Sequence, residues 1–266
     1  MEPMTIVIAV IVVGVIGLLC AVMLTIASKF MAVEVDERIP MVRECLPGAN
    51  CGACGYAGCD GYADALSKRD GAVKPNLCTP GGETAAKGVC EVLGIPFEGV
   101  KAVKSVIRCS GDFDTSVYVM DYEGPKTCRA CNAFYQGRRS CSYGCLGYGD
   151  CAEACKFGAL TIQNGLAIVN RELCTGCGAC AKVCPNHLFE MVPDTSTVWV
   201  GCSSHDKGAF TRKICTAGCI GCMKCQKTCE YGAITVTGNL AHIDPEKCTG
   251  CGACVEVCPV HVIHKV

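Results

Sequence analysis

The sequence lacks the motifs with which enzymes hold nucleotides and attack substrates. No Gly-x-Gly-x-x-Gly follows a predicted strand, no phosphate loop is present, and no Ser/His or Cys/His set suits nucleophilic catalysis. These absences argue against nicotinamide, flavin or substrate-converting chemistry within this chain. The net charge of −1 points to no particular partner, and we expect none among nucleic acids.

Cysteine, by contrast, is abundant: 28 of 266 residues. One stretch has the x2, x2, x3 spacing and the following proline of a bacterial-type ferredoxin, and it consists of Cys174, Cys177, Cys180, Cys184 and Pro185. Three thiolates on such a loop bind one four-iron cluster, and the fourth serves a neighbouring cluster. Two further copies contain Cys248, Cys251, Cys254, Cys258 with Pro259, and Cys219, Cys222, Cys225, Cys229 with Glu230. An altered copy, spaced x3, x5, x3, contains Cys141, Cys145, Cys151, Cys155 and then Lys156.

A constant offset of 74 residues relates these copies, for example 219 − 145 = 74 and 258 − 184 = 74. The same offset joins Cys128 to Cys202 and Cys141 to Cys215, so we interpret the second half as a gapless duplicate of the first. In this register Tyr148 stands where the second copy has Cys222. We therefore expect Cys141, close upstream, to replace the missing middle ligand.

The repeat also predicts the fold of each unit. Residues 159–163 and 166–169 alternate like strands around Asn164-Gly165, a type I′ turn sequence, and 233–237 and 240–243 repeat the pattern. Each unit is thus a small ferredoxin-like module that needs its clusters to stay folded.

Two other uses of abundant cysteine are disulfides and zinc. A disulfide scaffold requires a secreted chain, and no cleavable signal is evident. Isolated zinc sites do not call for interlocked copies with a distant fourth ligand. Iron–sulfur clusters are therefore the favoured interpretation.

An apolar stretch, Thr5–Ala27, precedes the cysteines and contains 23 uncharged residues. At 1.5 Å per residue it spans about 34 Å as a helix, enough to cross a bilayer. It is long for a signal peptide and has no basic residue before it, while Lys29 follows it. We expect one membrane-spanning helix in contact with lipid, with the body on the cytoplasmic side of the cell membrane.

A second kind of cysteine cluster follows, rich in small residues, within the stretch from Cys45 to Cys59. Its predicted ligands to a separate four-iron cluster are Cys51, Cys54, Cys59 and Cys78, with Cys45 as a spare. A short helix ending at Leu93 is expected to stop at Gly94.

The apolar helix, the stretch Asn50–Cys59 and the loop Cys141–Cys151, in that order, resemble the B subunit of the Rnf complex over essentially the whole chain. The resemblance implies an electron-carrying subunit, without a substrate-converting site of its own, of an ion-translocating ferredoxin oxidoreductase. Reduced soluble ferredoxin would be the donor, the other partners would be further membrane and cytoplasmic subunits, and electron transfer would be coupled to Na⁺ or H⁺ translocation. Alternatives are a polyferredoxin-type subunit of another membrane hydrogenase or dehydrogenase, and a membrane-anchored redox sensor.

Crosswise assignment predicts four clusters in the modules in addition to the N-terminal one. Their ligand sets are Cys141, Cys145, Cys151 with Cys184; Cys174, Cys177, Cys180 with Cys155; Cys219, Cys222, Cys225 with Cys258; and Cys248, Cys251, Cys254 with Cys229. We predict a sixth [4Fe-4S] cluster from Cys109, Cys128, Cys202 and Cys215, any of which Cys131 could replace. The alternative is that these are reduced, packed thiols.

The predicted architecture is α+β. It has a transmembrane anchor (1–28), an N-terminal cluster domain (29–100), a connecting segment (101–135), a first ferredoxin-like module (136–195) and a second (196–266).

Overall fold

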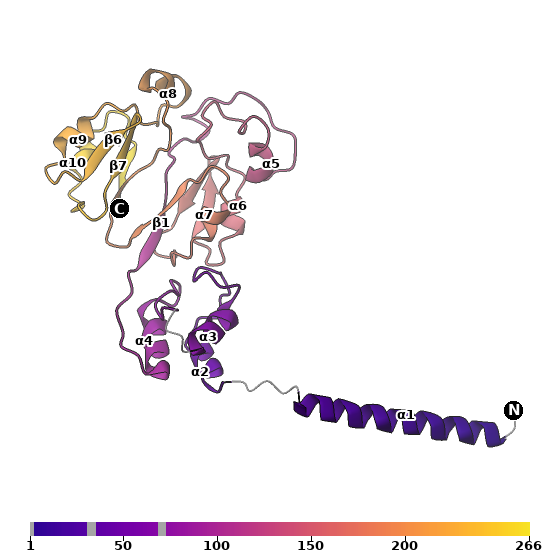
Figure 1. The fold of residues 1–266 in the computed structure, drawn as a ribbon. Coiled ribbons are helices and arrows are strands. Elements are labelled where there is room, and N and C mark those ends of the chain that lie inside the picture. Colours follow the sequence, from indigo (N-terminus) through magenta and orange to yellow (C-terminus); the bar gives the residue numbers. More distant parts are fainter. Residues whose placement is uncertain (1–2, 31–35, 69–72) are drawn as a thin grey trace.

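A computed structural model describes residues 3–30, 36–68 and 73–266. The first of these ranges is one helix, α1 (Pro3–Phe30), drawn in indigo in Figure 1. Its segment Val10–Lys29 has a mean hydropathy of 2.9, and none of it is buried against the rest of the chain. A helix of this length and composition can cross a membrane, as the sequence predicts.

Three helices build the N-terminal cluster domain: α2 (Arg38–Glu44), α3 (Cys59–Ser67) and α4 (Gly82–Leu93). They enclose Val42, Tyr62 and Val89, each at most 1% exposed. Helix α4 ends where Gly94 takes a left-handed conformation (φ 66°), so the expected stop is confirmed.

The first module contains α6 (Asp150–Glu153), β2 (Leu160–Gln163), β3 (Leu166–Val169), α7 (Ala179–Val183) and β4 (Phe189–Pro193). Strands β2 and β3 form the predicted antiparallel hairpin, with both turn residues, Asn164 and Gly165, at positive φ. The connecting segment contributes strand β1 (Val103–Ile107), which pairs antiparallel with β4, and helix α5 (Cys128–Asn132).

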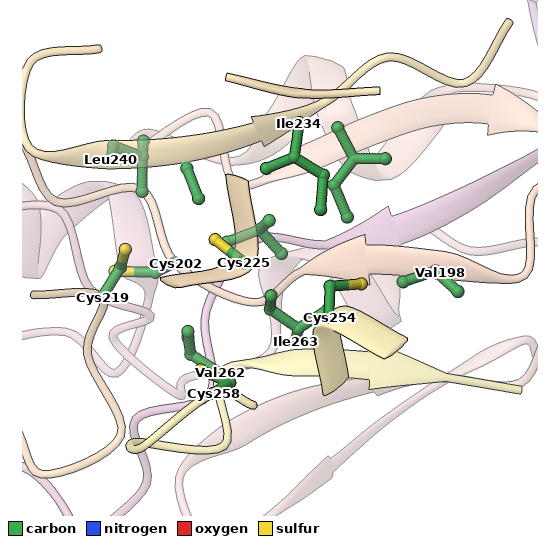
Figure 2. Packing of buried hydrophobic residues seen from close by; sticks show 13 residues of the cluster. Val198, Cys202, Cys219, Cys225, Ile234, Leu240, Cys254, Cys258, Val262 and Ile263 are labelled. Carbon is green, nitrogen blue, oxygen red and sulfur yellow. The ribbon is translucent and has the colours of Figure 1, made fainter. Parts of the chain in front are cut away.

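The second module repeats this plan with β5 (Val198–Val200), α8 (Gly208–Ile214), α9 (Lys224–Thr228), β6 (Ile234–Thr237), β7 (Leu240–Ile243), α10 (Ala253–Glu256) and β8 (Ile263–Lys265). Strand β5 pairs with β8, and β6 pairs with β7. Aliphatic and cysteine side chains share one core, in which Figure 2 shows Cys219, Cys225 and Cys258 among Ile234, Leu240 and Val262. Cysteine therefore makes up much of the interior of so small a unit.

The duplication is not gapless, which corrects the sequence interpretation. Ile107 at the end of β1 pairs with Phe189, and Val200 at the end of β5 pairs with Ile263, 74 positions after Phe189. The residues that follow these strands also make equivalent hydrogen bonds. The amide of Arg108 donates to the carbonyl of Leu188, and the amide of Gly201 donates to that of Val262. The structural counterpart of Cys202 is therefore Cys109, not Cys128. The offset of 74 between Cys128 and Cys202 does not reflect structural equivalence. The first module has a longer segment between β1 and its first cysteine loop than the second module has after β5.

Candidate iron–sulfur sites

The N-terminal cluster domain brings its four predicted ligands together. Burial, followed by the nearby thiols of Cys59, Cys51 and Cys54, raises the pKa of Cys78. Cys59 begins α3, and its amide donates to Asn50 Oδ1 at 2.7 Å, which fixes the loop against the helix. The Tyr62 hydroxyl donates to the carbonyl of Lys74 at 2.7 Å and accepts from the amide of Leu77 at 3.2 Å, so it holds the segment that carries Cys78.

Three more sets assemble as the crossed pattern predicts. One cavity of about 20 Å³ is lined by Cys155, Cys174, Cys177 and Cys180. A second, also of about 20 Å³, is lined by Cys219, Cys222, Cys225 and Cys258. For the last set, burial and the thiols of Cys248, Cys251 and Cys229 raise the pKa of Cys254. The fourth cysteine of each run thus lies with the other run of its module, as in two-cluster ferredoxins.

Ser105 on β1 contacts one of these sets, and nothing in the sequence pattern marked it. Its amide lies 3.4 Å from Cys174 Sγ and its hydroxyl 3.4 Å from Cys180 Sγ. Hydrogen bonds to ligand sulfur are among the means by which a protein adjusts an iron–sulfur potential.

The altered copy in the first module is completed by Cys128, not by Cys141. Its cavity, again of about 20 Å³, is lined by Cys128, Cys145, Cys151 and Cys184, and Cys141 is not among the lining residues. Burial, then the thiols of Cys145, Cys128 and Cys184, raise the pKa of Cys151 to about 12. The fourth cysteine beside this cavity is therefore on α5, not the Cys141 that we expected from proximity in sequence.

Asp150 explains why Cys128 reaches this position. The carboxylate accepts hydrogen bonds from the amides of Cys128 (2.8 Å) and Arg129 (3.1 Å) at the start of α5, immediately before Cys151. The Thr127 side chain caps the same turn by accepting from Ala130. Asp150, which precedes Cys151, therefore fixes the helix that carries Cys128.

Cys141 lies instead in a cavity between the two modules, with Cys109, Cys202 and Cys215. The segment 115–119 joins these residues, because Val117 donates to Ile214 of the second module and accepts from Ser140 of the first, both at 2.9 Å. Cys141 and Cys215 are thereby brought to the same cavity.

The two modules make equivalent contacts to the thiols of this intermodule set. The Cys145 amide approaches Cys109 Sγ at 3.4 Å, and the equivalent amide of Cys219 contacts the Cys202 thiol. Burial, then the neighbouring thiols, raise the pKa of Cys141 to about 12 and that of Cys202 to about 11. The sequence analysis predicted a set of Cys109, Cys128, Cys202 and Cys215 between the modules, and in the structure Cys141 lies in that cavity while Cys128 lines the other.

Arg139 is a buried cation beside the intermodule set, with only 4% of the residue exposed. Its guanidinium donates to the carbonyls of Gly111 (2.7 Å) and Gly165 (2.9 Å). Its positive charge acts to lower the pKa of Cys109, against the larger effect of burial, which raises it. The guanidinium fits a site in which four thiolates must carry negative charge.

The spacing of the thiols fits a cluster better than a single ion. In the described ranges no three His, Cys, Asp or Glu side chains are grouped closely enough to hold one metal ion. Four thiolates on one zinc ion would lie only about 3.8 Å apart. A four-iron cluster brings its own iron and sulfide, so its thiolates stand further apart around a central space. Each of the four cavities is lined by four cysteines, the number of thiolates that such a cluster binds.

Comparison with known proteins agrees with this geometry. Three family models match: "Putative Fe-S cluster" at residues 46–80, "4Fe-4S binding domain" at 167–189 and "4Fe-4S dicluster domain" at 218–262. The chain is 42% identical, over 93% of both chains, to the B subunit of the ion-translocating oxidoreductase complex of Methanosarcina acetivorans. It belongs to the family of Rnf B subunits.

Two further relatives extend this result. The B subunit of the Na⁺-translocating ferredoxin:NAD⁺ oxidoreductase complex of Acetobacterium woodii is 41% identical over 94% of this chain and 75% of its own length. The B subunit of the proton-translocating ferredoxin:NAD⁺ oxidoreductase complex of Clostridium ljungdahlii is 38% identical over 98% of this chain and 93% of its own. As an Rnf B subunit, the chain is an iron–sulfur electron-transfer component of an ion-translocating oxidoreductase complex.

The remaining cysteines of this Rnf B subunit lie outside the six sets. Cys131 is fully buried beside Cys128 and Leu146, and Cys90 is buried on α4. Cys45 donates a weak hydrogen bond to the carbonyl of Met41, and Cys20 is exposed on α1. The two buried thiols, Cys131 and Cys90, pack as small side chains.

Proposed function

We propose that this chain passes electrons from reduced ferredoxin through six four-iron clusters to other subunits of an Rnf-type complex, which couples the transfer to Na⁺ or H⁺ translocation. The observation that carries the proposal is the gathering of 24 cysteines into six sets of four. Each bound [4Fe-4S] cluster would supply a one-electron carrier.

Contacts between sets support a continuous path through the modules. Cys145 of the Cys128 set contacts Cys109 of the intermodule set, and Cys219 of the second module contacts Cys202. The intermodule set therefore adjoins one set on each side. Without it, the two modules would carry separate pairs of clusters.

Helix α1 supports attachment to the membrane, and we assign the cysteine-rich body to the cytoplasmic side because Lys29 lies at the body end of that helix. Among the basic residues around the connecting segment, Arg139 is buried, and Lys104 donates to the carbonyl of Cys174. Lys101, Lys126 and Arg129 remain exposed and could attract an acidic ferredoxin.

The alternatives are a polyferredoxin subunit of another membrane complex and a redox sensor. The match of residues 46–80 to an iron–sulfur family model, together with α1 and similarity over the whole chain, counts against the first. A sensor would require an effector domain, and the described ranges are occupied by the anchor, the cluster domain and the modules.

Iron and acid-labile sulfide analysis of anaerobically prepared protein tests the proposal. We expect about 24 iron per chain, falling by about four in Cys202→Ala and in Cys215→Ala. About 20 iron, unchanged in these variants, would leave five clusters and no carrier between the modules. A few zinc ions with almost no sulfide would contradict electron transfer by this chain altogether.

A further inference from the structure

Two lysines of the first module contact the cysteine loop of the N-terminal cluster domain. Lys156 Nζ donates to the carbonyls of Ala49 (3.0 Å) and Asn50 (3.2 Å), and Lys182 Nζ donates to the carbonyl of Gly52 (3.1 Å). In the described parts of the chain, these are the three hydrogen bonds between residues 36–93 and residues 103–266. The two lysines thus hold the loop from both sides of Cys51.

The contact joins two ligand sets directly. Lys156 follows Cys155 in sequence, and its ammonium group binds the carbonyl of the residue before Cys51. Lys182 lies between Cys180, of the same set as Cys155, and Cys184 of the Cys128 set. Cys155 and Cys51 are therefore linked through two neighbouring residues, Lys156 and Asn50, and the hydrogen bond between them.

The second module has the opposite charge at both positions. The offset of 74 places Glu230 where the first module has Lys156, and Glu256 where it has Lys182, and both glutamates are exposed. A carboxylate cannot donate a hydrogen bond to a backbone carbonyl. The loop 49–52 can therefore bind the first module but not its duplicate.

We propose that Lys156 and Lys182 are positioning residues that dock the N-terminal cluster domain on the first module, so that electrons pass between the Cys51 set and the Cys155 set. The inference rests on the proposed electron-transfer function. In each transfer one cluster loses one electron and the other gains it, with no further reactant. Both lysines are exposed and act through three hydrogen bonds, so the contact is weak enough to open and close.

The test uses the full-length, cluster-loaded chain in detergent under anaerobic conditions. Lys156→Ala with Lys182→Ala removes the contacts, and Lys156→Arg with Lys182→Arg retains a donor at each position. Lys227→Ala is the matched control, because Lys227 lies between Cys225 and Cys229 as Lys182 lies between Cys180 and Cys184 and is exposed on α9. Iron content and the electron paramagnetic resonance spectrum of the reduced protein are measured for each. The component absent from Cys59→Ala identifies the N-terminal cluster.

We expect the double alanine variant to retain all its iron but to lose the spin–spin broadening of the N-terminal component. Electron transfer to that cluster should slow by about tenfold, in line with the loss of weak docking bonds. The double arginine variant and the Lys227→Ala control should resemble the unmodified chain. Full iron with unchanged broadening in the double alanine variant would overturn the proposal, as would loss of about four iron, which would make the lysines structural. An iron content of about 20 in the unmodified chain bears only on the intermodule cluster, because the Cys51 and Cys155 sets do not depend on it.

Discussion

The two ferredoxin-like modules use the same plan but fill one ligand position differently. In the second module Cys222 completes its own loop, and it is exposed. In the first module the equivalent residue is Tyr148, whose ring lies 4.5 Å from the guanidinium of Arg138 and meets the Tyr122 ring edge-to-face, with centroids 6.0 Å apart. Cys222 thus lines the cavity of the second module, whereas Tyr148 contacts the segment between Cys109 and Cys141, which we call the covering segment.

The covering segment accounts for the difference. Cys109 and Cys141 are 32 positions apart, whereas their counterparts Cys202 and Cys215 are 13 apart, so the first module has 19 additional residues here. These residues include α5 and Cys128. Cys128 lines the cavity of the first module, and Cys141 lines the intermodule cavity together with Cys215, its counterpart in the other copy. The same number of cysteines thus surrounds each cavity although they come from different elements.

The largest expected effect comes from removing Cys128. We predict that Cys128→Ala loses about four iron, because only three cysteines, Cys145, Cys151 and Cys184, would then line that cavity. Iron and sulfide analysis measures the loss. Cys131→Ala, which removes a buried neighbouring thiol, should keep its iron, and equal losses in both variants would show that α5 supports folding rather than ligation.

A second substitution tests whether a cysteine at position 148 can restore the iron that Cys128→Ala loses. We predict that Tyr148→Cys, combined with Cys128→Ala, restores the lost iron, because it recreates the ligand pattern of the second module. The same iron analysis checks this result. If the double variant remains deficient, position 148 does not face the cavity as Cys222 does.

Arg139 and its counterpart Lys213 should respond very differently to the same substitution. Arg139→Met leaves the carbonyls of Gly111 and Gly165 without these donors beside an anionic site, and we expect a destabilisation of about 2–5 kcal/mol. Lys213 is exposed on α8, so Lys213→Met should cost less than about 0.5 kcal/mol. The temperature at which cluster absorbance bleaches under anaerobic conditions compares them. Similar bleaching temperatures would contradict a structural role of Arg139 between the modules.

The smallest effect is expected in the hairpin turns. Gly165 has φ +73° and lies against the ring of Phe113, whereas its counterpart Asn239 has φ +64° and is exposed. Gly165→Asn should destabilise by about 1–3 kcal/mol because the ring must move. Asn239→Gly should change stability by less than about 1 kcal/mol. Thermal bleaching again measures both, and an equal response would mean that Phe113 shifts without cost.

Much of this protein was determined by local sequence patterns. The spacing of Cys174–Pro185 and its copies predicts the crossed ligand sets, because a short loop can direct only three thiolates to one centre. Asn164-Gly165 predicts its hairpin, Gly94 the end of α4, and the uninterrupted apolar residues of α1 a helix able to span a membrane. Each of these features depends on residues within about 20 positions of one another, or on an exact repeat.

Only the tertiary structure decided which of Cys128 and Cys141 serves which set. Cys141 is closer in sequence to Cys145, but the segment 115–119 pairs its neighbours with residues next to Cys215, and Asp150 holds α5 over the cavity of the first module. Likewise, the lysines that follow Cys155 and Cys180 acquire a role only because the loop 49–52 folds against them. These assignments depend on hydrogen bonds between segments far apart in the chain, which no local spacing encodes.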